Sequence, residues 1–480
     1  MKKIKKMFFV LLLGCSSQLW AQSDAMLNFS WSNPLRTYYS PSLPYYHDAY
    51  IALPALSGIN AQVYNAFLPY NDIFIRDAEG YPVSIQTEQF LQKLKKENWL
   101  SLNTNINLLG FGFRVNSKLF LSLDIRFRAD ISAAYSKDLF GLILQGNMAY
   151  LGDENPARLA LKANVNAYQE YGVGVQYKLP MGFTLGVRPK LLFGAANLQT
   201  RTLAADLYTH PETYALRMHY DAAINASLPF PYQLSTDTIG FDFAGFSAGN
   251  LFRNVGGAID LALRYEIDSI FSVNLGVRDL GFIRWKSNCV ELTSVLADNG
   301  DFYNDGFLQF EGVTETQLEQ LMNNDEYLNQ VLDSVVGYFP LNDSVIAAYN
   351  TMLNPKIYAQ FDAQLNKNHK FSLLAQGEFI GKWFNPSLTI AYSGFYGKTL
   401  ELGVAYTIKK RSFANLGVSL GLHLRAVTLY AACSDVLTAF KPSRLSNCSV
   451  QAGLIVHWRT KKFKETLHNS VVTKSDLQEF

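Results

Sequence analysis

Residues 119–135 alternate between apolar and polar side chains, and this period of two constrains the fold more than any other feature of the sequence. The odd positions are apolar or small, whereas the even positions are mostly polar and include four charged residues: Asp124, Arg126, Arg128 and Asp130. Successive side chains of a β-strand point to opposite faces, so the segment is predicted to be a strand with one apolar and one polar face. It is longer than typical globular strands of about 5–6 residues and longer than the about 9–11 residues that cross a bilayer.

The same alternation recurs along the chain. Together with 119–135, the runs lie at 161–177, 183–193, 203–208, 216–226, 257–265, 271–280, 357–365, 371–379, 387–393, 400–408, 416–425, 427–434 and 450–458. Many two-faced strands in series predict an antiparallel meander. The count is about 14, and runs at 59–67 and 101–115 would raise it to 16. A phase slip at Leu108-Leu109 predicts a bulge in the latter run.

The connections between these runs distinguish a membrane barrel from a soluble β-sandwich, which would also alternate. Short turns are predicted at 116–118, 180–182, 268–269, 366–369, 395–397 and near Arg425, and longer connections at 136–158, 229–255, 281–355 and 435–449. Short periplasmic turns with longer external loops are typical of outer-membrane barrels. We therefore predict an all-β fold, an antiparallel transmembrane β-barrel of 14–16 strands with an N-terminal plug or cap and a helical extracellular insert.

The first 21 residues have the pattern of a secretory signal peptide. A lysine-rich start is followed by the short apolar run 7–14 and by Ala21 at a cleavage position. The apolar run is too short to span a membrane, which disfavours the alternative of an anchor helix. A second alternative is that Leu12 to Cys15 is a lipobox, with a lipid attached to Cys15. The signal predicts Sec-dependent export to the outer membrane.

Four further segments are not strands of the predicted barrel, which spans residues 59–458. Residues 22–58 contain four prolines and are predicted to form a plug or periplasmic cap. The insert 281–355 is predicted to be extracellular and to contain a helix, because apolar residues from Leu328 to Val336 fall on one helical face. Residues 87–96 are predicted to be a short helix, and 459–480 a polar periplasmic tail.

The last predicted strand carries the pattern of an assembly signal. Its pattern residues are Gln451, Gly453, Val456 and Trp458. This arrangement resembles the signal that the outer-membrane assembly machinery reads, although here the polar tail follows it. The predicted partners are therefore outer-membrane lipid and the barrel assembly machinery, with a surface or secretion-complex protein as a further candidate.

Three segments resemble a known group of proteins. They are Tyr430–Pro442, Asp279–Trp285 and Tyr50–Asn60, and they are similar to segments of an uncharacterised Bacteroidota outer-membrane β-barrel family with a domain of unknown function. The resemblance implies a barrel distantly like the long-chain fatty-acid transporters and the shuttle barrels of type IX secretion. It implies no established activity.

Composition and motifs exclude several functional classes. Mean hydropathy is zero and no run of 18 apolar residues follows the signal, which excludes a helical membrane protein. A net charge of +2 provides no basic surface for nucleic acid. No metalloprotease HExxH, Walker loop or CxxC occurs, and the histidines stand singly, so we predict neither an enzyme nor a cofactor or metal site. Cys433 and Cys448 flank one predicted outer loop and are a candidate disulfide.

The charged residues on the polar faces are predicted to point into the barrel lumen. They are Asp124, Arg126, Arg128, Asp130, Arg188, Lys190, Arg217, Asp221, Asp260, Arg264, Arg278 and Glu378. Charges of both signs can line an open pore or form a salt-bridged filling, and a 14-stranded barrel with a plug favours the filling. Two functions remain open. One is a plugged facilitator for a small amphipathic or hydrophobic molecule, and the other is a non-transporting scaffold for a secretion or surface-assembly complex.

Overall fold

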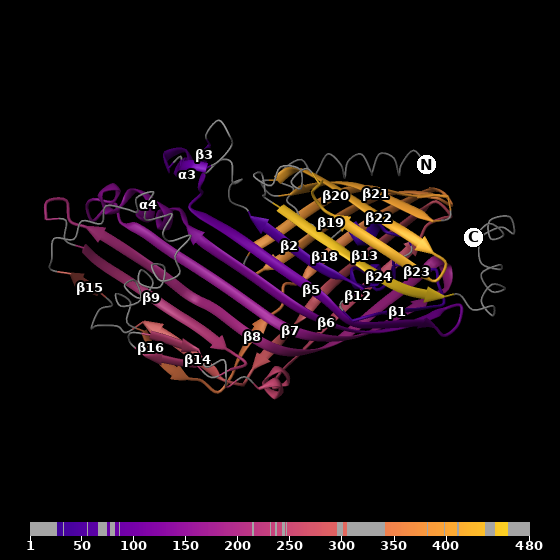
Figure 1. The fold of residues 1–480 in the computed structure, drawn as a ribbon, viewed down its shortest axis with the longest axis horizontal. Helices are drawn as coiled ribbons and strands as arrows, with labels where there is room; N and C mark the ends of the chain where they lie inside the picture. Colours follow the sequence, from indigo (N-terminus) through magenta and orange to yellow (C-terminus); the bar gives the residue numbers. More distant parts are fainter. Residues whose placement is uncertain are drawn as a thin grey trace.

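A closed antiparallel β-barrel is the main feature of the computed structural model (Figure 1). The structure describes residues 26–458 except 32, 55, 66–73, 77–81, 86, 214–215, 231, 236–237, 242–244, 246, 295–300, 305–340, 382, 398, 410–411 and 437–446. The proposed signal peptide, the lipobox cysteine, the helix over 328–336 and the tail at 459–480 lie outside these residues.

Within the described residues, the ring has fourteen wall positions. Two are composite, one formed by β1 (Ala49–Ala52) with β2 (Ile59–Asn65) and one by β17 (Tyr349–Met352) with β18 (Lys356–Asn366). The others are β5 (Glu97–Arg114), β6 (Leu119–Ser136), β7 (Ala157–Lys178), β8 (Phe183–Thr209), β12 (Asn254–Glu266), β13 (Phe271–Trp285), β19 (His369–Ile380), β20 (Trp383–Tyr396), β21 (Leu400–Lys409), β22 (Ser412–Leu424), β23 (Val427–Cys433) and β24 (Asn447–Trp458). The predicted barrel class and strand number are confirmed.

The ring closes between its first and last strands. β1 and β2 each pair with β24 on one side and with β5 on the other. Between them the chain leaves the wall, and the carbonyl of Gly58 accepts a hydrogen bond from the backbone N–H of Asn107 at 2.9 Å. The predicted bulge in β5 is present, as a register shift between Asn107 and Leu109. The wall therefore begins at residue 49, earlier than the predicted residue 59.

The two faces of the wall differ in chemistry. Outward positions are apolar and 38% to 54% exposed, for example Leu123, Leu191, Leu261, Leu275, Ile390, Val404 and Leu420. Inward positions on the same strands are mostly polar and buried. Because a closed ring satisfies all backbone groups and this face is apolar, the fold is suited to hydrocarbon outside the ring. Among the described residues, no helix has the length and apolar character needed to span a membrane.

The number of wall strands agrees with the prediction, but the segments that form them differ. Residues 203–208 are not a separate pass, because β8 is one continuous strand of 27 residues. Residues 216–226 form most of β9 (Leu216–Ser227), which pairs with the distal half of β8 beyond the ring. The two runs treated as optional, 59–67 and 101–115, instead supply β2 and β5. Two predicted runs are therefore not wall strands and two optional runs are, so the number of wall strands stays at fourteen.

The long strands continue beyond the ring into an extension, at the left of Figure 1. The extension consists of the distal parts of β7 and β8 together with β9, β14 (Cys289–Ser294), β15 (Asp301–Asn304) and β16 (Leu341–Val345). Helix α4 (Lys137–Gln145) packs on it, where Leu142 and Tyr150 contact Leu207 and Met218. The described parts of the insert 281–355 are therefore strands.

The remaining elements are short. They are α2 (Met26–Phe29), η1 (Pro34–Tyr38), the hairpin β3 (Phe74–Arg76) with β4 (Pro82–Ile85), α3 (Thr87–Lys93), η3 (Asn147–Ala149), η4 (Pro180–Gly182), the hairpin β10 (Tyr232–Ser235) with β11 (Thr238–Phe241), and η6 (Ala248–Phe252). Helix α3 confirms the predicted helix at 87–96, with an earlier end. In η1, Asn33 accepts a hydrogen bond from the backbone N–H of Leu35, and Pro34 occupies a first-turn position where its missing N–H costs nothing.

Residues 26–43, which we call the inner segment, lie inside the ring. Their hydrogen-bond partners come from strands around the lumen: Asn28 with Gln360, Phe29 with Ser393, Trp31 with Glu401, Tyr39 with Gln451, Ser42 with Asn274 and Leu43 with Gln176. Gln176, Asn274, Ser393 and Glu401 lie in the halves of their strands nearest the short turns. The inner segment therefore occupies the short-turn end of the ring.

Candidate functional site: a charged cavity in the barrel lumen

The centre of the lumen contains a network of buried ion pairs around Glu170. Glu170 of β7 stands opposite Arg126 of β6 in the strand register and is fully buried. Its carboxylate pairs with Arg126, with Arg128 at 3.1 Å and with Arg188 at 3.4 Å. Lys190 lies 3.8 Å away. One carboxylate thus faces four cations, and the network compensates the desolvation of each.

Asp124 and Gly172 place Arg188 in this network. The Arg188 guanidinium pairs with the Asp124 carboxylate, and both side chains are buried. A Cβ at position 172 would lie 2.7 Å from Nε of Arg188 and 3.1 Å from Oδ1 of Asp124. Gly172 therefore leaves the space that the guanidinium occupies.

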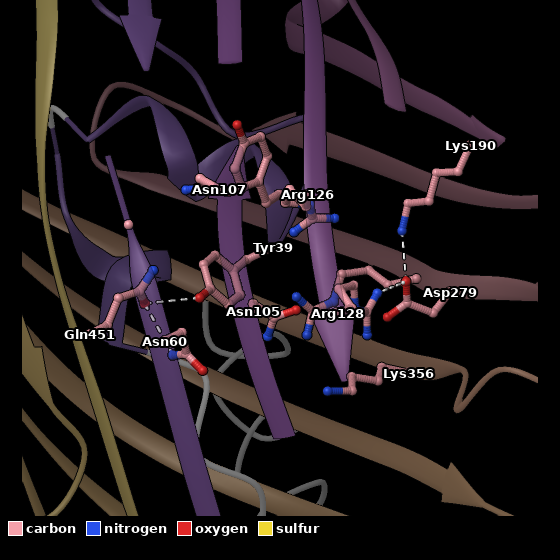
Figure 2. A pocket seen from close by; sticks show the side chains of 13 residues that line it. Tyr39, Asn60, Asn105, Asn107, Arg126, Arg128, Lys190, Asp279, Lys356 and Gln451 are labelled. Atoms are coloured by element: carbon pink, nitrogen blue, oxygen red, sulfur yellow. Dashed lines mark hydrogen bonds and ion pairs between the residues drawn. The ribbon is translucent and has the colours of Figure 1, made fainter. Parts of the chain in front are cut away.

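Asp279 joins the network through an irregularity in β13. The register between β12 and β13 shifts at this point, so that two residues of β13 oppose Asp260. Asp279 has φ +57°, and its backbone N–H donates to Oδ1 of Asp260 at 2.7 Å. Its carboxylate then accepts from Arg128 at 2.8 Å and from Lys190 at 2.7 Å (Figure 2). The bulge turns a carboxylate into the lumen at a position that regular pairing would not place there.

The inner segment contacts these cations through two tyrosines. The ring of Tyr38 lies between two guanidinium groups, with its centroid 4.6 Å from Cζ of Arg126 and 4.4 Å from Cζ of Arg188. The Tyr39 ring lies 5.2 Å from Cζ of Arg278, and its hydroxyl donates to Gln451 at 3.1 Å. Cations over aromatic faces attract the ring quadrupole, so these contacts hold the inner segment against the charged wall.

Beside these contacts lies an open cavity of about 500 Å³, a volume that includes the solvent at its mouth. Its lining residues are Tyr38, Tyr39, Gly58, Asn60, Asn105, Asn107, Arg126, Arg128, Lys190, Arg278, Asp279, Lys356 and Gln451. Figure 2 shows side chains converging on it from β2, β5, β6, β8, β13, β18 and β24. Lys356 lies at the end of β18 away from its short turn, and Gln451, which stands opposite Asn60, lies in the half of β24 nearer the connection before it. The cavity is therefore on the long-loop side of the inner segment.

The structure brings ten of the twelve predicted lumen charges into the ring. Eight belong to the network just described or pair at its edge, namely Asp124, Arg126, Arg128, Asp130, Arg188, Lys190, Asp260 and Glu378. Arg264 pairs with Asp362 at 3.0 Å, and Arg278 lines the cavity. The prediction that Arg217 and Asp221 face the lumen is wrong, because both lie on β9, which belongs to the extension. Arg217 contacts exposed Asp153 there, and Asp221 is exposed.

Three important lumen residues were missed by the sequence reasoning. Glu170 occupies an even position of the run 161–177, so the alternation itself contained the signal for it. Lys356, whose Nζ lies 3.1 Å from the Glu378 carboxylate, is at the first residue of β18, where a predicted boundary is least reliable. The side chain of Asp279 points into the lumen because of a bulge, and no pattern in the sequence specifies that direction.

The predicted assembly signal and disulfide fall at the closing strand. Position 453 faces the chain that leaves the wall between β1 and β2, and a Cβ there would lie 2.6 Å from the backbone of Ser57. Gly453 therefore leaves the space that the backbone at Ser57 occupies, whatever its part in the assembly signal. Cys433 is opposite Val450, two residues along β24 from Cys448. The disulfide stays a prediction, and peptide mapping with and without reduction would test it.

One catalytic-looking motif stands in the long connection after β9. Residues 245–249, Gly-Phe-Ser-Ala-Gly, have the spacing of a nucleophile elbow. Ser247 is exposed and precedes the five-residue 3-10 helix η6, whereas an elbow serine lies on a sharp turn between a strand and an α-helix. Among the described residues, no group of three or more His, Cys, Asp or Glu side chains could hold a metal ion.

The sequence matches a family without an assigned role. The model of a family described as "Family of unknown function (DUF5723)" matches residues 41–434. The chain belongs to this family. The matched range contains all the charged residues of the lumen network, from Asp124 to Glu378. No curated protein matches the chain.

Several solved barrels resemble the chain in fold at very low identity. The Pseudomonas putida toluene transporter TodX is 8% identical, with 89% of this chain and 93% of that chain covered and a TM-score of 0.39. The CymD monoaromatic hydrocarbon channel is 8% identical, with the same coverages and a TM-score of 0.32. The translocator domain of the autotransporter NalP from Neisseria meningitidis is 6% identical, with 88% and 93% covered and a TM-score of 0.30.

Proposed function

We propose that this family member is a plugged facilitator of the outer membrane, in which the inner segment controls the passage of a small solute. The observation that carries the proposal is the division of the lumen. The inner segment occupies the short-turn end, and the charged cavity lies beyond it toward the long loops. A solute that enters from the long-loop side would reach the cavity first and would pass only after the inner segment moves.

The chemistry of the cavity narrows the solute class. The prediction from sequence named an amphipathic or hydrophobic molecule. The cavity lining is dominated by amide and charged groups, and its aromatic surface comes from Tyr38 and Tyr39. Specificity in a binding site comes from such convergent polar groups. We therefore propose an amphipathic solute with a polar head group rather than a hydrocarbon.

Solute uptake into liposomes that contain the purified full-length protein tests this proposal. We expect slow, saturable uptake, because passage requires displacement of the inner segment. The variant Tyr38→Ala removes the ring between Arg126 and Arg188 and should increase the uptake rate. No uptake of any solute by either protein would exclude transport.

A scaffold is the second candidate, and the filled lumen favours it. Buried ion pairs occupy the centre of the ring, and the extension presents β9, β14 and β16 outside the ring. Under this alternative a surface or secretion-complex protein would dock on the extension. Co-purification of such a partner from membranes, lost when the extension is shortened but retained in Tyr38→Ala, would support the scaffold.

We also propose that β24 carries the signal for the barrel assembly machinery. Its residues Gln451, Gly453, Val456 and Trp458 lie on the strand that closes the ring. Trp458→Ala should reduce the amount of folded barrel in the outer membrane without changing the stability of the fraction that folds.

A further inference from the structure

Arg278 is a buried cation at the cavity that makes no direct ion pair with a carboxylate among the described residues, although its charge acts on Asp279. Its side chain is 6% exposed, and it lines the cavity. Its Nε has no hydrogen-bond partner, and no ion pair or hydrogen bond of its guanidinium occurs among the described residues. The guanidinium lies against the ring of Tyr39 instead. An unsatisfied buried charge is costly, and a missing ion is one physical reason for it.

The other cations around the cavity show how unusual Arg278 is. Arg126 and Arg128 pair with Glu170, Lys190 pairs with Asp260, and Lys356 pairs with Glu378. Each of these cations therefore has a carboxylate of the wall within 4 Å. Arg278 is next to Asp279 in sequence, yet the Asp279 carboxylate is bound by Arg128 and Lys190.

The cavity lining has an excess of positive charge and hydrogen-bond donors. Five lining residues are cations, and Asp279 is the one carboxylate among them. Glu170, Glu378 and Asp260 neutralise the other cations from positions outside the lining. Side-chain amides add further N–H donors around the same space, at Asn60, Asn105, Asn107 and Gln451.

We propose that this cavity is a binding site for a small oxyanion, a carboxylate or a phosphate group, and that Arg278 is its main binding residue. A guanidinium presents two parallel N–H donors that match two oxygens of such a group. The bound anion would supply the direct ion pair that Arg278 lacks, and the amides would bind its remaining oxygens. This inference deepens the proposed function, since it assigns an anionic head group to the solute, but binding itself does not require transport.

The route to the site follows from its position. Arg278 lies farther along β13 from the short turn than Asn274, which bonds with Ser40 and Ser42 of the inner segment. The inner segment therefore separates the site from the short-turn end. An anion that arrives from the long-loop end would bind beside Tyr39 while the inner segment is still in place.

Calorimetric titration of the full-length protein in detergent, at constant chloride, tests the proposal with inorganic phosphate and with acetate as probes. We expect saturable binding of at least one probe at a single site. Binding of phosphate alone would indicate a phosphorylated solute, and binding of both would indicate a site for either oxyanion. Arg278→Gln should weaken the binding by at least about tenfold, because a charge-assisted pair is lost, and Arg278→Lys should restore part of it.

The matched control is Arg264→Gln, which removes a part-buried lumen arginine whose partner is Asp362 and which does not line the cavity. It should bind the probes as the unsubstituted protein does. If Arg278→Gln does not fold, Asn105→Asp provides an independent test, because a negative charge in the lining should weaken binding with Arg278 intact. Equal binding by the unsubstituted protein and Arg278→Gln, or no binding of either probe, would overturn the proposal. Absence of solute uptake together with Arg278-dependent binding would reject the transport function and leave the anion site standing.

Discussion

Strands β7 and β8 pass through two environments, and the same face of their continuous sheet is apolar in both. In the ring, the inward residues Arg188 and Lys190 are buried and charged, and the outward Leu191 is 47% exposed. In the extension, Ala205 and Leu207 are buried beneath α4, and the opposite face carries polar residues. Ala195 is an extra residue in the pairing between β7 and β8, and a second register shift, between Ala160 and Asn164 of β7, restores the phase, so Leu191 and Leu207 both stand opposite odd residues of β7. Each bulged residue shifts the alternation by one position, and the two together leave the same face apolar.

Alternation in the sequence therefore shows that the two faces of a strand differ in polarity, but it does not show what covers the apolar face. Hydrocarbon covers the apolar face of the ring, whereas a helix covers the apolar face of the extension. The ion pairs differ in the same way. Glu170 is fully buried in the ring, whereas the Arg201–Glu291 pair of the extension has side chains 48% and 24% exposed.

The largest expected effect comes from the same substitution made at these two glutamates. Glu170→Gln leaves four buried cations facing a neutral amide, and we expect the free energy of unfolding to fall by about 3–5 kcal/mol. Glu291→Gln removes a solvent-exposed pair and should cost less than about 1 kcal/mol. Urea unfolding in detergent, followed by tryptophan fluorescence, measures both. Equal losses in the two variants would contradict a special role of burial in the ring.

A second pair of variants tests what covers the outer face. Leu191→Arg places a charge on the lipid-facing side of β8 and should destabilise the folded barrel in liposomes by roughly 2–4 kcal/mol. Ala204→Arg makes a comparable change on the exposed face of the same strand in the extension, where water solvates the new charge. We expect its effect to be within about 0.5 kcal/mol of zero. A similar loss for Ala204→Arg would mean that the extension also contacts lipid.

A third variant tests the apolar face of the extension that α4 covers. Met218 is 7% exposed and packs with Leu207, Tyr220 and Leu142. Met218→Ala should cost about 2 kcal/mol, at the low end for buried truncations, because the site lies at the edge of the fold. Hydrogen exchange should show faster opening of β9 with unchanged protection in β20–β23. Faster exchange throughout the ring would show that the two regions unfold together.

The sequence was sufficient to predict the barrel class, the strand number and most lumen charges, because few folds accommodate a period of two over strands this long. It could not assign 203–208 and 216–226 correctly, because an extension outside the membrane alternates as regularly as a membrane pass does. Arg217 and Asp221 were misplaced for this reason. Asp279 was missed because a bulge with a positive φ turns its side chain inward. The isolation of Arg278 depends on which carboxylates the other cations bind, and that is a property of the assembled lumen.

The smallest expected effect concerns the inner segment, where the environment again decides what a polar group contributes. The Tyr38 hydroxyl is buried beside Tyr50 without a well-formed hydrogen bond, and its ring lies against Arg126 and Arg188. Tyr38→Phe should therefore change the free energy of unfolding by less than about 0.5 kcal/mol, because the hydroxyl makes at most a poorly aligned contact. Tyr38→Leu loses both cation–π contacts and should cost about 1–2 kcal/mol. If the same urea titration shows a larger loss for Tyr38→Phe than for Tyr38→Leu, the hydroxyl rather than the ring would hold the inner segment in place.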